Sequence, residues 1–212
     1  MLGVMVQYSV KLNSEYYPLL QVVPRFAQNC TPCDGGYFKE HAVKFLPIVN
    51  NDIVAIIDDC DYEKLKNYRW YVNKRERTLY VRTTILVDGK LKPKSLHRII
   101  MGDPKGFCVD HINHDGLDNR RCNLRIATQS QNCMNRLPYK EGSSRFKGVR
   151  WHKQNKLWEA VIWVKPKSIY LGCFTDEIAG AKAYDIAARK YFGEFASLNF
   201  PKEGEGSADE SI

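Results

Sequence analysis

Apolar positions along the chain alternate or recur at intervals that predict short strands and helices. The run IVAIIDD (53–59) is an apolar strand that ends in acidic residues, and YEKLKNYRWYV (62–72) has helical spacing with Leu65 and Tyr68 turned inward. The stretch TLYVRTTILVDGKLKPKSLHRIIM (78–101) predicts a hairpin, because its Asp-Gly pair suits the tight turns that join paired strands. These segments predict a small β-rich platform.

A strand, a polar loop, a second strand and a helix are predicted next. FCVDHI (107–112) and LRIAT (124–128) are apolar and contain β-branched residues, and the turn-rich stretch NHDGLDNRR joins them. Thr128 and Gln131 have the spacing of a capping box, which places Asn132 in the first turn of a helix that ends before the next proline. Such a unit brings the end of the first strand close to the start of the helix.

Three further strand-like runs, KGVRWHKQ (147–154), LWEAVIWV (157–164) and SIYLGCF (168–174), precede the helical stretch DEIAGAKAYDIAARKYFG (176–193). Acidic residues open this helix and a glycine closes it. Alternation turns one face of the strands toward the helix and leaves the other face with polar and aromatic side chains, namely Arg150, His152, Trp163 and Tyr170. The fold class predicted for the whole chain is α+β.

Composition adds an electrostatic preference. The chain has 212 residues and a net charge of +8, and residues 143–200 alone hold 10 basic and 5 acidic side chains. A basic body favours a polyanionic partner, although charge by itself does not identify one. No apolar run approaches the ~20 residues of a membrane span, and the N-terminal stretch lacks the features of a signal peptide. We therefore expect no membrane association and no secretion, and a location in the cytoplasm of a bacterial or phage-infected cell.

The two ends of the chain carry fewer signals. Residues 1–44 mix short apolar runs with prolines and glycines and are treated as a poorly determined extension, and the acidic tail 202–212 is expected to be disordered. Cys30 and Cys33 form a CxxC, with His41 downstream. A structural zinc site needs four ligands, and no second pair exists, so free thiols are favoured over a zinc site.

The stretch after residue 107 carries candidate chemistry. Asp110 and the amide of Asn132 offer oxygen ligands of the kind that hard divalent cations prefer. His111 follows Asp110 directly, and an imidazole is mostly neutral at cytoplasmic pH, as a general base must be. A base, a metal and a basic surface together favour the hydrolysis of a phosphodiester.

This segment resembles the HNH endonuclease family, particularly the homing endonucleases of phages and bacteria. The resemblance rests on V-D-H-I-N, D-N-R-R, N-L-R and Q-N between residues 109 and 132, and the preceding S-L-H-R-I-I-M (95–101) is also similar. It implies a ββα-metal fold in a nuclease module over 45–138, of the kind without zinc. It also implies site roles: a divalent metal, magnesium or manganese, on Asp110 and Asn132, a general base at His111, and an asparagine that fixes the loop and orients the base at Asn123.

Two other histidines lie near this motif. His114 stands in the loop, where it would be a backup ligand, a phosphate contact or neither, and we favour neither. His97 precedes Arg98, and a satisfied structural histidine is favoured over a role in DNA or metal binding.

Residues 146–201 resemble the AP2/ERF DNA-binding domain, and residues 139–145 form the predicted linker to it. The matching stretches are F-K-G-V-R, W-E-A-V-I, Y-L-G-C-F, A-K-A-Y-D-I-A-A and L-N-F-P. The resemblance implies a three-stranded antiparallel sheet packed on one helix, with DNA contacts at Lys147, Arg150, His152, Trp163 and Tyr170. Plant members usually carry arginine where Trp163 and Ser168 stand and tryptophan where Gln154 stands, so the fold transfers better than the contacts.

The predicted function is that of a homing-type DNA endonuclease whose second module binds the target. Double-stranded DNA is the expected partner, and no protein partner is expected. One alternative is a sequence-specific DNA-binding protein whose HNH part is vestigial. A third reading, an RNA-binding structural protein, is favoured by the charge alone.

Overall fold

The computed structural model describes residues 8–12, 15–19, 42–75, 77–138 and 141–202. The chain divides into two compact units, Met1–Glu40 and His41–Ile212. In the first unit, strand β1 (Tyr8–Leu12) pairs antiparallel with β2 (Glu15–Leu19). Most of the expected N-terminal extension, with Cys30, Cys33 and His41, and nearly all of the acidic tail lie outside the described residues.

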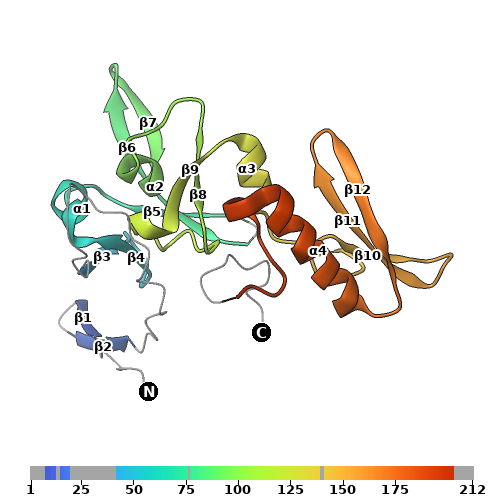
Figure 1. Cartoon of the computed structure of the whole chain (residues 1–212). Helices are drawn as coiled ribbons and strands as arrows, with labels where there is room; N and C mark the ends of the chain where they lie inside the picture. Colours follow the sequence, from blue (N-terminus) through green and yellow to red (C-terminus); the bar gives the residue numbers. More distant parts are fainter. Residues whose placement is uncertain (1–7, 13–14, 20–41, 76, 139–140, 203–212) are drawn as a thin grey trace. The chain divides into compact units, whose positions relative to one another are not determined.

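The second unit is a mixture of helices and small antiparallel sheets, as the α+β class predicts (Figure 1). Its sheets are β3–β4 (Val43–Pro47, Val54–Asp58), β5–β6–β7 (Tyr71–Lys74, Leu79–Val87, Lys90–Ser95), β8–β9 (Cys108–His111, Leu124–Ala127) and β10–β11–β12 (Val149–His152, Leu157–Val164, Lys167–Phe174). Its helices are α1 (Asp59–Leu65), α2 (Leu96–Ile100), α3 (Gln129–Met134) and α4 (Glu177–Phe192), with short 3-10 turns η2 (Arg121–Asn123) and η3 (Gly193–Phe195). In the described part of the chain, no helix is long and apolar enough to span a membrane.

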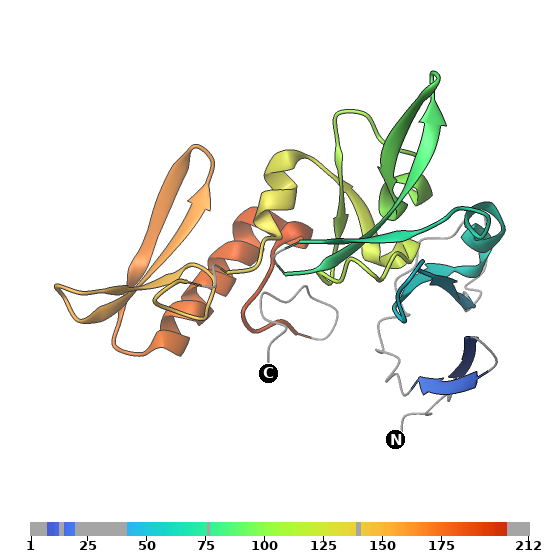
Figure 2. The ribbon, with the colours of Figure 1, turned by 180° about the vertical axis from the view of Figure 1, so that it is seen from behind.

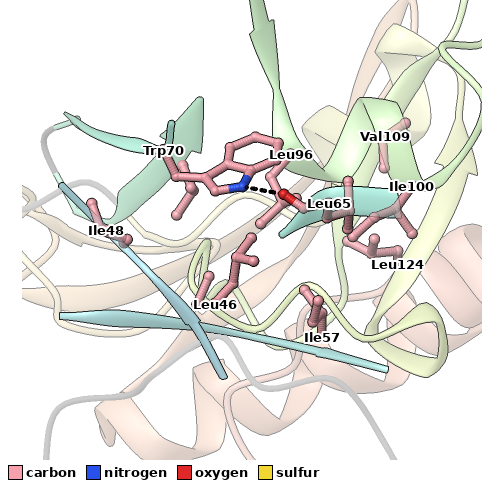
Figure 3. Packing of buried hydrophobic residues seen from close by; sticks show 11 residues of the cluster. Leu46, Ile48, Ile57, Leu65, Trp70, Leu96, Ile100, Val109 and Leu124 are labelled. Atoms are coloured by element: carbon pink, nitrogen blue, oxygen red, sulfur yellow. Dashed lines mark hydrogen bonds between the residues drawn. The ribbon is translucent and has the colours of Figure 1, made fainter. Parts of the chain in front are cut away.

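The platform and the β8–β9 pair share one apolar core. Trp70 is almost fully buried in it, and Val109 and Leu124 extend it into β8 and β9 (Figure 3). The helix expected over 62–72 is shorter than predicted, because α1 ends at Leu65 and a strand begins at Tyr71. Leu65 is buried as predicted, but Tyr68 is 42% exposed. The indole Nε1 of Trp70 donates to the Leu65 carbonyl at 3.0 Å, so a side chain five residues downstream satisfies a carbonyl at the helix end.

The predicted hairpin forms β6 and β7. Asp88 and Gly89 both have positive φ, 52° and 72°, as a two-residue turn of the type that matches strand twist requires. The sequence pattern predicted that the hairpin continues to residue 101. In the structure β7 ends at Ser95 and α2 follows. This helix buries Leu96 and Ile100 in the platform core.

Helix α4 packs on one face of the sheet β10–β11–β12, and Figures 1 and 2 show this from both sides. Ile162 of the middle strand buries against Tyr184 and Ala188 of the helix. Asp176 caps the helix by accepting from the backbone N–H groups of Ile178 and Ala179. We refer to residues 146–201 as the C-terminal module.

Candidate active site

A cleft of about 740 Å³ opens where β8 ends, beside the start of β6 and the chain that follows α3. Asp110 and His111 lie on its wall, together with Arg77, Thr78, Tyr80, His114, Arg136, Leu137, Pro138 and Glu141. The Asp-His pair singled out by the sequence therefore faces a cavity, and the surrounding side chains add arginines suited to an anionic substrate.

Strand alternation gives Asp110 and His111 different surroundings. Val109 and His111 lie on the side of β8 that meets the platform core, whereas Asp110 points to the opposite side. Its cross-strand neighbour is Arg125, whose Nε and Nη2 donate to Asp110 Oδ2 at 2.9 and 2.8 Å. Asn135 Nδ2 donates to both carboxylate oxygens, at 3.1 and 3.0 Å. The carboxylate is buried and held from two directions.

His111 is held by ring packing and by one asparagine. Its ring lies 5.0 Å from that of His97 and 5.7 Å from that of Tyr80, measured between centroids. Its Nε2 is 3.3 Å from Asn119 Oδ1, and Asn119 is fully buried. Burial lowers the pKa of His111, while Asn119 and the nearby carboxylates act in the opposite direction. A neutral imidazole of this kind can accept a proton.

His97 is buried beside His111, but within the described residues one of its ring nitrogens lacks the hydrogen bond that was expected of a structural histidine. Burial, with His111 and Arg98 nearby, lowers its pKa to about 3, so the ring is neutral and packs edge-on against His111. Its buried Nδ1 has no hydrogen-bond partner in the described part of the chain, so the predicted satisfied histidine is not satisfied. His114 lines the cleft with a φ of 64°, and its Nε2 lies 3.4 Å from Ser197 Oγ.

Asn123 is hydrogen-bonded within the polar loop. Its Nδ2 donates to Asn113 Oδ1 and to the Asp118 carbonyl, each at 2.8 Å, and its Oδ1 accepts from the Asn113 N–H at 3.0 Å. The side chain that contacts the His111 ring, however, is Asn119. The sequence reasoning missed Asn119, because nothing in the local pattern distinguishes it from the other asparagines of the loop.

Asp58, at the end of β4, and Asp61, in α1, anchor the same loop to the platform. Asp58 accepts from the backbone N–H of Arg121 at 2.7 Å, and Asp61 accepts two bonds from the Arg121 guanidinium, at 2.8 and 2.7 Å. An acid that closes the predicted strand, Asp58, and a second one in α1, Asp61, thus hold the D-N-R-R stretch in place.

The helix α3 begins with the predicted capping box between Thr128 and Gln131. Asn132 lies in this helix and is half-buried. The amide that reaches Asp110 belongs instead to Asn135, one helical turn later, which is 3% exposed and also donates to the His111 carbonyl at 3.0 Å. Asn135 follows Asn132 by three residues, so both lie on the same side of the helix and helical spacing alone does not distinguish them.

The carboxylate of Asp110 and the amide oxygen of Asn135 are ligand types that hard divalent cations prefer. Asn135 Oδ1 is buried and has no hydrogen-bond partner in the described residues, a costly state for a carbonyl oxygen. A rotation of this amide about its last side-chain torsion brings the oxygen beside the Asp110 carboxylate. Among the described residues no three His, Cys, Asp or Glu side chains gather as a metal site, so water and phosphate would complete the shell.

The predicted DNA contacts fall into two groups. Arg150, His152, Trp163 and Tyr170 lie on the face of the sheet turned away from α4, and both aromatic residues are 60% exposed. Arg150 Nε donates to Glu159 on the neighbouring strand at 2.7 Å. Lys147 is not part of this face. It is half-buried, and its ammonium group donates to the Met134 carbonyl at the end of α3.

Comparison with known proteins defines the class. Residues 102–134, which span the Asp-His strand and the whole of α3, match a family model described as HNH endonuclease. The chain is also 31% identical over 148 residues to an uncharacterized HNH endonuclease of Acanthamoeba polyphaga mimivirus, covering 64% of this chain and 68% of that relative. The chain belongs to the HNH endonuclease family.

A second similarity covers a shorter part of the chain. An AP2/ERF and B3 domain-containing protein of Oryza sativa subsp. japonica is 43% identical over 67 residues, which is 32% of this chain and 18% of that protein. An AP2-like ethylene-responsive transcription factor of Arabidopsis thaliana is 37% identical over 86 residues, 28% of its length. The chain therefore shares one domain-sized segment with these plant proteins and spans less than a third of either.

Proposed function

We propose that the protein is a metal-dependent DNA endonuclease of the homing type. The observation that carries the proposal is the buried Asp110–His111 pair on the wall of one cleft, with Asn135 bonded to the carboxylate. Membership of the HNH endonuclease family and the similarity to AP2/ERF proteins support a DNA substrate.

His111 acts as the general base. When Asn119 Oδ1 accepts from the Nε2–H, the other ring nitrogen, Nδ1, is left to take a proton from water. A divalent metal, Mg²⁺ or Mn²⁺, on Asp110 and Asn135 would stabilise charge on the phosphate and the leaving oxygen. Arg77 and Arg136 line the same cleft and neutralise phosphate charge.

The proposed architecture assigns β8, β9 and α3 to a ββα-metal fold in a nuclease module over 45–138. Residues 139–145 connect it to an AP2/ERF-like module over 146–201 that anchors the enzyme on its target. The sheet face with Arg150, His152, Trp163 and Tyr170 is narrow enough to enter a major groove.

Plasmid cleavage tests the proposal. The wild type is incubated with supercoiled DNA and Mg²⁺ or Mn²⁺, and nicked and linear products are compared with those of His111→Ala. We expect products that need the metal and vanish in the variant, while DNA binding persists. A wild type that binds DNA tightly yet leaves it intact contradicts nuclease activity.

One observation favours a second function, a DNA-binding protein with an inactive nuclease part. Both oxygens of Asp110 are already bonded to protein donors, from Arg125 and Asn135. If this arrangement persisted on DNA, these protein donors would compete with a metal for the carboxylate oxygens. The plasmid assay separates the two functions, because only the nuclease yields metal-dependent products.

Arg150→Ala tests the proposed DNA face. If the guanidinium reads a base, the variant loses roughly 1–3 kcal/mol of binding at the target site and less elsewhere. Lys182→Ala removes an exposed charge from α4 and serves as the control. An equal loss on every sequence would make Arg150 a phosphate contact instead.

A further inference from the structure

Arg125 connects the proposed catalytic carboxylate to the C-terminal module. Its Nε and Nη2 bond Asp110 Oδ2, as described, and its Nη1 donates to the Glu194 carbonyl in η3. The guanidinium also lies 4.3 Å from the centre of the Phe195 ring, a cation–π contact. Each nitrogen of this planar group thus donates a bond, two toward Asp110 and one toward η3.

The ion pair is enclosed by both parts of the chain. The Arg125 side chain is 13% exposed and that of Asp110 is 9% exposed. Close by, Met134 of α3 packs against the apolar core of the C-terminal module, and Lys147 donates to its carbonyl. Helix α3 and turn η3 are in contact. The C-terminal module therefore touches the nuclease site at the residues next to Asp110 and Asn135.

We propose that Arg125 is a positioning residue for Asp110 and that the turn Glu194–Phe195 of the C-terminal module holds Arg125 in place. The nuclease centre is then built by both parts of the chain. The forked contact fixes Oδ2, which leaves Oδ1 to face the position that the Asn135 amide occupies. This inference rests on the proposed nuclease function.

The guanidinium has two opposing effects on the site. It orients the carboxylate, which favours catalysis, and its positive charge repels a cation bound to the same carboxylate. Removing it should therefore slow cleavage without weakening metal binding. Partial collapse of the site would instead weaken metal binding and slow cleavage together, so the two readouts separate positioning from general damage.

The experiment uses the full chain and a duplex that the wild type cuts. Arg125→Gln should lower the single-turnover rate roughly ten- to a hundredfold, as expected for groups that orient metal ligands. The Kd for DNA should stay the same. Mn²⁺ affinity, measured by electron paramagnetic resonance on the inactive His111→Ala background, should be unchanged or higher. Arg125→Lys keeps the charge but not the fork and should be intermediate.

Two variants in the C-terminal module test the second half of the proposal. Phe195→Leu keeps an apolar side chain but removes the aromatic face under Arg125, and it should slow cleavage in the same direction as Arg125→Gln. Phe200→Leu is the matched control, since Phe200 packs on Phe146 instead, and it should cut at the wild-type rate.

The possible contrary results have different meanings. An unchanged rate in Arg125→Gln, or a lost rate accompanied by weaker Mn²⁺ binding, overturns the positioning role. If Phe195→Leu cleaves at the wild-type rate while Arg125→Gln cleaves slowly, the C-terminal module does not hold Arg125 in place. If the wild type itself cuts no DNA, the proposed function fails, an outcome distinct from all of these.

Discussion

Asn135 has an amide whose two ends lie in different environments. Its nitrogen donates to Asp110 and to the His111 carbonyl, whereas its oxygen is buried without a partner in the described residues. Burying an unpaired acceptor costs about 1–3 kcal/mol, so a ligand that engages this oxygen recovers that cost. At this scale Asn135, not Asn132, is the stronger candidate for the second metal ligand.

Alanine variants of the two asparagines separate these candidates. Asn135→Ala should lower metal-dependent cleavage by at least about tenfold, because it removes the proposed oxygen ligand and a donor to Asp110. Asn132→Ala should cut within about two- to threefold of the wild type, since the loss of a half-buried helix side chain rarely matters more. The measurement is the cleavage rate over a range of Mg²⁺ concentrations. A large effect in Asn132→Ala and none in Asn135→Ala would restore the assignment suggested by the sequence.

Asn119 is expected to orient the base. Asn119→Ala removes the oxygen 3.3 Å from His111 Nε2 and frees the imidazole to rotate. Cleavage should slow by roughly ten- to a hundredfold, less than the loss of the base itself, which contributes ~10²–10⁴-fold. The Kd for DNA and the circular dichroism spectrum serve as controls. A rate equal to that of the wild type would mean that the neighbouring rings alone orient His111.

At the residue scale, the sequence predicted Asp110 and His111 because they are adjacent and lie toward the end of a predicted strand. It did not predict Asn119 or Asn135, because the choice among the asparagines is made by packing. Asn119 is selected by two backbone bonds of its loop to Ile56, at 2.8 and 2.7 Å, across more than 60 residues of sequence. No local spacing encodes such a pairing.

At the element scale, strong local rules were reliable and weak periodicity was not. The Asp88–Gly89 turn and the Thr128–Gln131 capping box are present as predicted, because each depends on a few neighbouring residues. The helical spacing over 62–72 was misleading beyond Leu65, because Trp70 is buried in the core and its indole bonds the Leu65 carbonyl. Long, patterned segments such as α4 were predicted closely, because they bury one face along their whole length.

Gly148 allows helix α4 to approach the sheet. It has a φ of 76°, and an added Cβ would lie 1.9 Å from a ring atom of Tyr184. Gly148→Ala should therefore lower the free energy of unfolding by more than about 3 kcal/mol, through left-handed strain and overpacking together. Gly106→Ala is the control, because its φ is 78° and nothing lies within 4 Å of the added atom.

Thermal unfolding measures the difference between these variants. Gly106→Ala should cost only the strain, about 1–2 kcal/mol, or ~2–8 °C in Tm for a chain of this size. Gly148→Ala should fall clearly further. Equal Tm values would show that Tyr184 moves aside at no cost, and that Gly148 is needed for its backbone conformation alone.

At the scale of the whole molecule, residues His41–Ile212 form one compact unit, although the sequence suggested two modules joined by a linker. The boundaries at 138 and 146 stay a proposal. Contacts that cross them are made by single side chains far apart in sequence, such as Arg125 with Glu194 and Lys147 with Met134. Isolated contacts of this kind leave no periodic signal, which is why sequence reasoning treated the two parts as independent.

Lys147 lies where the two parts of the chain meet, and we expect it to make the free energy of unfolding depend on pH. Burial, with Arg136 nearby, lowers the pKa of its ammonium group to about 7, against about 10.4 in an unfolded chain. Between these values the unfolded chain binds a proton that the folded chain has lost, so stability gained from this group rises as pH increases from about 7 to about 10. Below pH 7 both states are protonated, and the cost of burying the charge is constant.

Lys147→Met should remove that cost while keeping a long apolar side chain. At pH 7 the variant should gain at least about 1 kcal/mol, or ~2–4 °C in Tm, and the gain should shrink by pH 9.5. The exposed Lys182→Met should change neither value by a comparable amount. A lower Tm in Lys147→Met at pH 7 would mean that the bond to the Met134 carbonyl outweighs the burial of the charge, and that Lys147 fastens the two parts of the chain together.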